Sequence, residues 1–425
     1  MCFSDLNLCY NRTMRKKIFI VGNSAKSYAL TKKLSEQHDI YVTPKNDTLK
    51  EFATCLDIRE DSIDELLDFA MENDMDMTIA VSDVAIKSGI ADKFNDNKVP
   101  IFAPQAKSMD IIADKTIAKK TLYKLRIPTP KFGIFDKQNI ANDYLKNQKI
   151  PFVIKNNDSN SALVITSLDV AKNIIESWFI EKNKKIIVED YVYGTSFSFY
   201  AITDGYKALP FGSSINYKYS LDGDGGQLTS GMGSCVPNYK LSFENEYFIM
   251  DNVIYPTLEY LQNTNSPYLG IIGINGIITD NNEISILGWK TFMEDSDSAG
   301  ILNSIDDDLY MLFESCIIGS FSDEVTQIRT NNKQSVSVTL SCKVQDSNEN
   351  VIQGLDKLDE DTIITYYPTV IKNKYLEYEA KYGSVMTLTS SASSLAKAGC
   401  KVYEELENID YTGIYYRKDI CKVNK

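Results

Sequence analysis

The sequence predicts an α/β fold with more than one domain. Its first structured stretch is a short apolar run, Ile18–Val21, followed by the turn at residues 22–24 and by a helical pattern over 25–34. A strand, a glycine turn and a helix in this order are typical of the unit that builds a parallel sheet. The chain has 425 residues, of which 43% are hydrophobic and 24% charged. This length favours two to four domains, and the composition is ordinary for a globular protein.

The α/β alternation continues through the first hundred residues. Further strands are expected near residues 40–43, 78–82 and 99–102, with helices between them. A helix that begins after a glycine turn is suited to meeting an anion, but no second or third glycine follows Gly22, so a dinucleotide fingerprint is absent. Residues 1–13 precede a second methionine and are expected to be a disordered extension or a misassigned start.

The rest of the chain mixes strands and helices without a repeat. In order, we expect a helix from Asp114, a break at 127–130, strands at 149–155, 186–192, 197–203 and 208–212, a hairpin of 269–279 with 283–287, a helix at 305–320, and a β-rich module from 335.

Composition excludes several functions. The formal net charge is −13, which argues against a nucleic-acid partner. No apolar run is long enough for a membrane span. The eight cysteines form no C-x-x-C pair, so a zinc cluster is not expected. We expect them to be free thiols in a reducing cytoplasm. The single histidine, His38, is expected in a surface turn, which leaves almost no room for histidine chemistry.

The segment 225–233 is rich in glycine and follows two aspartates, Asp222 and Asp224. Such a segment has little to bury, and it is expected to expose backbone N–H groups and to let a ligand approach the main chain. The alternative interpretation is a flexible loop.

Two lysines and two acids precede this segment on successive elements. Lys115 and Lys155 suit the phosphates of a nucleotide, and Glu189 and Asp190 end a buried strand. Carboxylates late in the chain suit Mg²⁺. This order resembles the ATP-grasp ligases, which phosphorylate a carboxylate and let an amine attack the acyl phosphate.

Within that superfamily the chain resembles the glycinamide ribonucleotide synthetases (phosphoribosylamine–glycine ligases) over nearly its whole length. The matching segments are residues 21–23 with 28–30, Ile101–Pro104, Val188–Gly194, Thr229–Gly233 with Lys218, Asp222, Asp224 and Gly226 upstream, and Tyr415–Ile420.

The resemblance implies an N-terminal doubly wound α/β domain, ATP-grasp central domains and a small C-terminal α+β domain. The expected boundaries are 1–13 for the extension, 14–113 for the N-terminal domain, 114–132 with 193–327 for the ATP-grasp core, 133–192 for its lid, and 328–425 for the C-terminal domain.

The resemblance also implies small-molecule substrates, glycine and phosphoribosylamine, with ATP and Mg²⁺ as cofactors and no nucleic-acid or membrane partner. The implied ATP-binding residues are Lys115, Lys155, Glu189, Asp190, Tyr191 and Val192. The implied substrate-binding residues are Gly22, Asn23, Lys218, Asp224, Gly226, Thr229, Ser230, Gly231, Met232 and Arg417. A domain contact is the alternative for Arg417, and no catalytic residue is assigned.

The departures from the family concentrate in the phosphate loop and the metal site. The family's second loop lysine falls on Leu163, its loop glycines are missing, and Asp158 adds a negative charge. Its metal-binding glutamate and asparagine fall on Leu287 and Trp289, which offer no oxygen to Mg²⁺. No metal ligand is preserved, and the replacement candidates are Glu283 and Glu294.

Three hypotheses follow. The chain is a phosphoribosylamine–glycine ligase-like protein of purine biosynthesis with impaired or altered catalysis. Alternatively, it is a non-catalytic protein that binds a ligand or regulates a partner on the same scaffold. A ligase with a different amine or acid substrate is the third.

Overall fold

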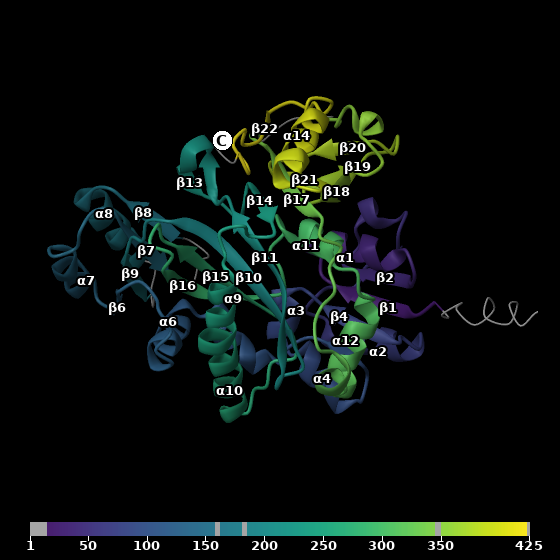
Figure 1. The fold of residues 1–425 in the computed structure, drawn as a ribbon, viewed down its shortest axis with the longest axis horizontal. Coiled ribbons are helices and arrows are strands. Elements are labelled where there is room, and N and C mark those ends of the chain that lie inside the picture. The colour runs from purple at the N-terminus through teal and green to yellow at the C-terminus, as the bar shows by residue number, and fades with distance from the viewer. Residues whose placement is uncertain (1–14, 158–161, 181–184, 345–349, 423–425) are drawn as a thin grey trace, which may run out of the picture.

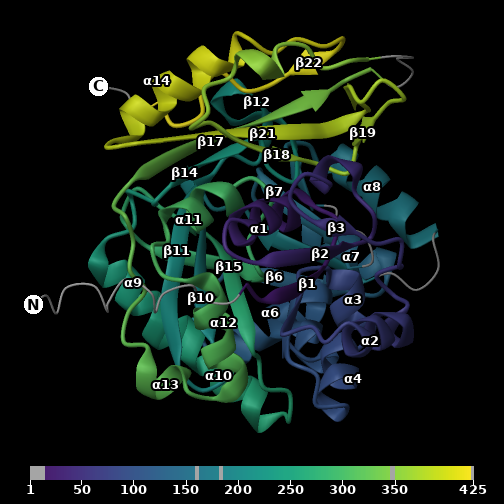
Figure 2. The ribbon, with the colours of Figure 1, turned by 90° about the vertical axis from the view of Figure 1, so that its right-hand side faces the viewer.

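The computed structural model describes residues 15–157, 162–180, 185–344 and 350–422. Figure 1 shows a long central sheet with the N-terminal sheet at the right and the four-stranded sheet with α7 and α8 at the left; the C-terminal strands of the central sheet and α14 lie at the top. The same C-terminal layer lies above the rest in Figure 2. The expected extension, residues 1–13, is outside the described residues.

The N-terminal part is a five-stranded parallel sheet in the order β3-β2-β1-β4-β5. This order is that of a doubly wound sheet, as the sequence predicts. Its strands are β1 (Lys17–Val21), β2 (Asp39–Thr43), β3 (Thr54–Cys55), β4 (Met77–Ala80) and β5 (Ile101–Phe102). Its helices are α1 (Ala25–Ser35), α2 (Ile63–Glu72), α3 (Asp83–Lys87), α4 (Ile90–Asp96) and α5 (Asp110–Ala113), with single turns η1 (Asp47–Leu49) and η2 (Ala106–Met109).

Alternate side chains of β1 pack into two different cores. Ile18 and Ile20 join the core that contains Leu30 of α1. Phe19 and Val21 join the core that contains residues of α2 and α4. Because successive strand side chains point to opposite faces, α1 covers one face of the sheet and α2 and α4 cover the other.

The second part is an antiparallel four-stranded sheet in the order β6-β9-β7-β8. It packs against two helices around Phe152, Ile154 and Ala171. Its elements are β6 (Phe132–Phe135), α7 (Gln138–Leu145), β7 (Phe152–Asn156), β8 (Ala162–Ile165), α8 (Leu168–Ile180) and β9 (Ile186–Asp190), and α6 (Lys115–Lys124) leads into it.

The central sheet has nine strands and runs β16-β15-β10-β11-β14-β17-β21-β18, with β22 paired to β17. It is antiparallel throughout, and β14 pairs with β17 from Gly233↔Val338 to Val236↔Ser335. The sheet is therefore continuous across residue 327, where the sequence predicts a boundary. Its strands are β10 (Thr195–Thr203), β11 (Ala208–Asn216), β14 (Gly233–Val236), β15 (Gly270–Ile278), β16 (Ile284–Thr291), β17 (Gln334–Cys342), β18 (Ile363–Tyr366), β21 (Gly383–Ala392) and β22 (Ile414–Tyr415).

The remaining elements cover this sheet or form two small hairpins. The expected hairpin of 269–279 with 283–287 is confirmed as β15 and β16, and α12 lies within the expected helix at 305–320. These elements are β12 (Tyr219–Leu221), η3 (Asp222–Asp224), β13 (Gly225–Leu228), α9 (Phe243–Ile249), η4 (Met250–Ile254), α10 (Tyr255–Asn263), α11 (Ser298–Ser304), α12 (Leu309–Ile318), α13 (Phe321–Glu324), η5 (Leu355–Lys357), β19 (Val370–Lys372), β20 (Tyr378–Ala380) and α14 (Leu395–Leu406).

Two expectations about single residues are wrong. His38 lies in a turn but is only 6% exposed, because its ring packs on Tyr310 with 5.2 Å between the ring centroids. Burial lowers its pKa. Cys235 and Cys421 are not free thiols: they form a disulfide with 5.9 Å between their Cα atoms.

Across the described ranges, no helix has both the length and the apolar character that a membrane crossing requires.

Candidate active site

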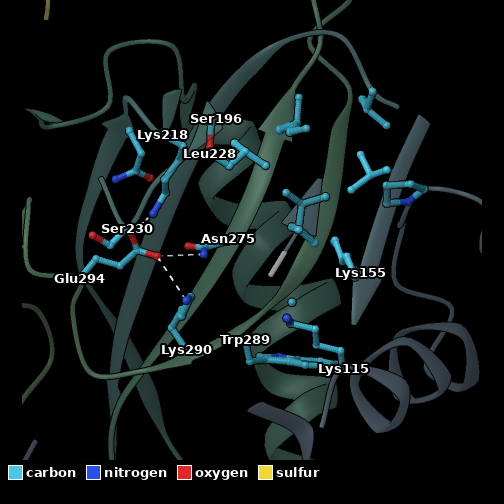
Figure 3. A pocket seen from close by; sticks show the side chains of 18 of the residues that line it. Lys115, Lys155, Ser196, Lys218, Leu228, Ser230, Asn275, Trp289, Lys290 and Glu294 are labelled. Carbon is cyan, nitrogen blue, oxygen red and sulfur yellow. Dashed lines mark hydrogen bonds and ion pairs between the residues drawn. The ribbon is translucent and has the colours of Figure 1, made fainter. Parts of the chain in front are cut away.

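A cavity of about 990 Å³ lies between the four-stranded sheet and the central sheet. Side chains of α6, β7 and β9 form one wall, and those of β15 and β16 form another. The loop around Ser230 and the residues that lead into it close a third side. Figure 3 shows these walls, with Lys115 and Lys155 on one side of the cavity and Lys218, Ser230 and Glu294 on the other.

One wall contains a cluster of two lysines around one glutamate, which we call the closed cluster: Lys119, Glu189 and Lys155. The Nζ of Lys119 lies 2.5 Å from Oε2 of Glu189, and Lys155 forms an ion pair with Oε1. Lys119 also donates to Oγ1 of Thr129 at 2.8 Å. The exposed side-chain fractions are 2% for Lys119, 1% for Glu189 and 13% for Lys155.

Charge pairing overcomes burial at Glu189. Burial alone raises the pKa of this carboxyl, but Lys155 and Lys119 outweigh it and hold the pKa below its usual value. Burial lowers the pKa of Lys119 to about 8. Glu189 therefore serves as the counter-charge of two lysines.

Lys115 begins α6 at the edge of the closed cluster. Its Nζ donates to the backbone oxygen of Asn156 at 3.1 Å. Burial, together with the charges of Lys155 and Lys290, lowers its pKa to about 8. The sequence places it one helical turn before Lys119, so that both side chains lie on the same face of α6.

The opposite wall contains a second cluster, which we call the open cluster: Lys218, Glu294 and Lys290. Lys218 forms an ion pair with Oε2 of Glu294, and Lys290 lies 3.7 Å from Oε1. Nδ2 of Asn275 donates to the same Oε1 at 2.9 Å. Figure 3 shows all three side chains converging on Glu294. The exposed side-chain fraction of Lys290 is 39%, and burial together with Lys290 lowers the pKa of Lys218.

A β-bulge in β16 brings Lys290 into this wall. Asn275 pairs with Gly288 and Gly276 pairs with Ile286, so Leu287 has no partner in β15. The extra residue reverses the alternation of side chains. Ile286 and Trp289 consequently pack in the same core, and Lys290 faces the other side together with Asn275.

Trp289 fills space and does not offer a free platform for a base. It is 3% exposed, and its Nε1 donates to Oγ1 of Thr257 at 3.2 Å. This agrees with the sequence-based interpretation that it is a core or pocket-filling residue.

The glycine segment is more ordered than expected. Residues 225–228 form β13, which pairs with β12. The backbone N–H of Thr229 donates to the oxygen of Lys218 at 2.7 Å, and that of Met232 donates to Tyr217 at 2.8 Å. The N–H of Gly231 donates to Oγ1 of Thr229 at 3.1 Å. The expectation that these N–H groups face a ligand is therefore wrong for these three residues.

The glycines serve close packing. Gly231 has a φ of +140°, and a Cβ there would lie 2.7 Å from Oγ of Ser296. A Cβ on Gly233 would lie 2.4 Å from the backbone oxygen of Ser337 in β17. The turn can approach these neighbours only without side chains.

Arg417 lies outside the residues that line the cavity. Its guanidinium is 1% exposed and pairs with Asp224 at 2.8 Å and with Asp419 at 2.7 Å. It also donates to the backbone oxygen of Tyr219 at 3.1 Å. Arg417 thus fastens the C-terminal segment to the β12–β13 hairpin, in line with the alternative of a domain contact.

The disulfide acts at the same junction. Cys235 belongs to β14, directly after the glycine segment, and Cys421 follows Tyr415–Ile420. The N–H of Cys421 donates to the hydroxyl of Tyr217, next to Lys218, at 2.9 Å.

Gly22 and Asn23 follow β1 and are not among the residues that line the cavity. The N–H of Asn23 donates to Oε1 of Glu60 at 3.1 Å, and its Oδ1 accepts from Asn46 at 3.0 Å. The nearest lining residue on α1 is Lys26, whose N–H donates to Oδ1 of Asp295 at 2.8 Å.

The side chains present do not fit a magnesium site. In the described part of the chain, no three Cys, His, Asp or Glu residues are grouped so that they could hold a metal ion. Glu283 is exposed at the β15–β16 turn and does not line the cavity; it lines a neighbouring hollow of about 480 Å³ that shares residues 190–192 with the cavity. Glu294 already forms ion pairs with two lysines, Lys218 and Lys290. Asp297 is fully buried and accepts from Tyr200 at 2.9 Å, and its pKa is raised by burial.

The cavity brings together ten of the residues that the sequence analysis assigned to ligands. They are Lys115, Lys155, Glu189, Asp190, Tyr191, Val192, Lys218, Asp224, Thr229 and Ser230. Gly226, Gly231 and Met232 are adjacent to the lining but not part of it. Asp158 falls outside the described residues.

Sequence reasoning missed Lys119 and Lys290. The sequence contains a signal for Lys119, because it follows Lys115 by four residues on a predicted helix. It contains no signal for Lys290, because the orientation of that side chain depends on the bulge at Leu287.

Two family models match consecutive parts of the chain. The phosphoribosylglycinamide synthetase N domain matches residues 16–111, and the ATP-grasp (A) domain of the same family matches residues 113–298. Phosphoribosylamine–glycine ligase of Caldanaerobacter subterraneus is 27% identical over 95% of this chain and 99% of the relative. The ligase of Halalkalibacterium halodurans is 25% identical over 95% of this chain and 96% of the relative.

Solved structures agree on the fold. The crystal structure of phosphoribosylamine–glycine ligase from Thermotoga maritima has a TM-score of 0.79 at 18% identity and covers 95% of this chain and all of that one. Phosphoribosylglycinamide synthetase from Anaerococcus prevotii has a TM-score of 0.63 at 15% identity and covers 93% of this chain and 99% of that one. The parallel N-terminal sheet, the ATP-grasp core and the two consecutive domain matches have one common explanation: the chain belongs to the phosphoribosylglycinamide synthetase family.

Proposed function

We propose that the protein is a phosphoribosylamine–glycine ligase of purine biosynthesis whose phosphoryl transfer is impaired. The reaction joins glycine to phosphoribosylamine and converts ATP to ADP and phosphate, giving glycinamide ribonucleotide. The observation that carries the proposal is the continuity of the cavity: the strand end at residues 189–192 and the loop at Thr229–Ser230 open into one space. A nucleotide and an acceptor would therefore meet there.

The nucleotide half of the cavity has the chemistry that a base and phosphates require. Val153, Ile187 and Leu287 line it with apolar surface. Residues 190–192 follow the buried part of β9 and border the same surface, where backbone groups suit the edge of a purine. Lys115 and Lys155 bring positive charge toward the phosphates, which suits lysine as a compact point charge.

The acceptor half would hold the amino acid and the amine. Lys218 and Ser230 line it, and Asn275 adds an amide in the same wall. ATP supplies the phosphoryl group that activates the carboxylate of glycine. The protein's contribution is to orient that carboxylate toward the phosphates and to exclude water.

The reason for impairment is the missing metal site. Phosphoryl transfer depends on cations that neutralise the charge developing on the phosphate oxygens. With Leu287 and Trp289 at the family's ligand positions and Glu294 held by two lysines, the chain does not fit Mg²⁺.

The same observation favours a second candidate, a non-catalytic protein that binds the ligands without turnover. Both candidates need the cavity to bind ligand, and only the ligase needs it to release phosphate.

The test is an ATP- and glycine-dependent assay for phosphate release with freshly prepared phosphoribosylamine. The ligase predicts release that Lys155→Ala abolishes and that Lys120→Ala, an exposed change on α6, leaves unchanged. Thermal melting of each variant checks that it is folded. No release, together with stabilisation of the protein by ATP or glycinamide ribonucleotide, would instead identify a binding protein.

A further inference from the structure

The open cluster has more positive than negative charge, and it faces the cavity. Two ammonium groups, those of Lys218 and Lys290, share the single carboxylate of Glu294. Asn275 holds that carboxylate from a third side through its Nδ2. Glu294 is 9% exposed, whereas Lys290 is 39% exposed in its side chain. The carboxylate is therefore enclosed, and the Lys290 ammonium remains accessible to a ligand.

The residues that line the cavity have a different balance of basic and acidic side chains from the chain as a whole. The chain has 45 basic and 58 acidic residues. Among the residues described as lining the cavity, lysines number seven and acids six: Lys26, Lys115, Lys119, Lys155, Lys218, Lys240 and Lys290 against Asp83, Glu189, Asp190, Asp224, Glu294 and Asp295. A lining with one more lysine than acids stands out in an acidic protein and favours an anion over a cation.

The excess of lysine is located where a metal would need oxygen ligands. Leu287 and Trp289 lie on β16 next to Lys290 and provide no oxygen. Glu294, a carboxylate of the same cavity wall, is engaged by Lys218, Lys290 and Asn275. A divalent cation placed at Glu294 would have to displace two ammonium groups from it.

We propose that the ammonium groups of Lys290 and Lys218 take the place of the divalent cation, so that the cavity binds a nucleoside polyphosphate without metal. The inference rests on the proposed function in assigning the phosphate ligand to a nucleotide. Lys115 approaches the phosphates from α6 on the opposite wall, and its charge interacts with that of Lys290. The phosphate chain then lies between the two walls, with ammonium groups on both sides.

This arrangement separates binding from catalysis. Ammonium groups bind phosphate oxygens as point charges, each with up to three donors. They do not bridge two phosphates in a fixed coordination geometry as Mg²⁺ does. Binding therefore survives the loss of the metal, while phosphoryl transfer is weakened.

The experiment measures binding of the non-hydrolysable ATP analogue AMP-PNP to the full chain by calorimetry, in EDTA and in excess MgCl₂. We expect the two affinities to agree within about threefold. Binding that is more than about tenfold tighter with Mg²⁺ would overturn the inference and leave the proposed function standing. No binding under either condition would overturn both.

A set of variants assigns the effect to Lys290. Lys290→Gln is expected to weaken binding in EDTA by about tenfold, and Lys290→Arg to retain it, because arginine keeps the charge. Lys120→Gln, an exposed lysine of α6 outside the cavity lining, is the matched control and should bind like the parent protein. If Lys290→Gln binds as tightly as Lys120→Gln, the inference is wrong.

Discussion

The two lysine clusters have the same composition and different surroundings. In the closed cluster Glu189 is 1% exposed and Lys119 2%, and in the open cluster Glu294 is 8% exposed and Lys290 39%. The closed cluster connects α6, β7 and β9 and so ties the four-stranded sheet to the helix that leads into it. The open cluster connects the loop after β11 with the end of β16 and faces the cavity. Equal charge patterns thus support a structural role for Glu189 and Lys119, where water is excluded, and a binding role for Lys290, where it is not.

The largest difference is expected in stability. Glu189→Gln removes the carboxylate that pairs with two nearly buried lysines and is expected to cost about 3–5 kcal/mol in the free energy of unfolding. Glu294→Gln, in the open cluster, is expected to cost less, about 1–3 kcal/mol, because Lys290 can be hydrated although Glu294 and Lys218 are enclosed. Urea denaturation of both variants makes the comparison. Equal losses would remove the distinction between the clusters.

The next effect concerns the disulfide beside the open cluster. Cys421→Ser opens a cross-link that spans 186 residues and is expected to lower the free energy of unfolding by about 2–4 kcal/mol. Hydrogen exchange should become faster in residues 217–236 and stay unchanged in β9 of the closed cluster. Cys400→Ser, at an exposed free thiol, is the control. Faster exchange in β9 would show that the disulfide supports both clusters.

Most of the fold was predictable from the sequence, and so was the presence of two closed-cluster residues in a binding site. The strand–turn–helix alternation predicted the parallel sheet, and apolar runs on either side of residues 280–282 predicted the β15–β16 hairpin. The family resemblance assigned Lys155 and Glu189 to ATP, but sequence does not show that they pair with each other. That pairing depends on the register of β7 against β9, in which Lys155 lies opposite Ile187.

The open cluster and the contacts between distant parts of the chain were not predictable from local patterns. Lys290 faces the cavity because one residue is inserted opposite β15, and strand alternation alone would have given the wrong face. Asp224, which pairs with Arg417, and Cys235, which pairs with Cys421, lie more than 180 residues from their partners, where a pattern of residues gives no distance. Buried His38 illustrates the same limit, because Tyr310 comes from a distant helix.

The pH dependence of binding tests the lysine between the clusters. Burial and the charges of Lys155 and Lys290 lower the pKa of Lys115 to about 8, and a bound phosphate would raise it again. The contribution of Lys115 to AMP-PNP affinity is therefore full below about pH 7 and is expected to fall by about tenfold between pH 7 and pH 9. Lys115→Arg should remove this contribution to the fall, since arginine stays charged, while Lys218, whose pKa burial lowers to about 7, titrates in the lower part of the range. Calorimetry at three pH values distinguishes the two profiles, and identical profiles would exclude Lys115 as the titrating group.

The smallest effect is expected from a new carboxylate in the open cluster. Leu287→Glu should weaken AMP-PNP binding in EDTA by about fivefold through repulsion, and added Mg²⁺ should restore part of it. Leu287→Gln has a similar size without the charge and serves as the matched control. Equal affinities of the two variants in EDTA would mean that phosphates do not approach β16.

The most direct test of whether Lys290 and Lys218 replace the divalent cation is a crystal structure of the protein with AMP-PNP and Mn²⁺. Anomalous scattering is recorded for the manganese. We expect phosphate oxygens within hydrogen-bond distance of the Nζ atoms of Lys290 and Lys218, and no anomalous peak in the cavity. A manganese ion coordinated by Glu294 and the phosphates, with the two lysines displaced, would contradict it.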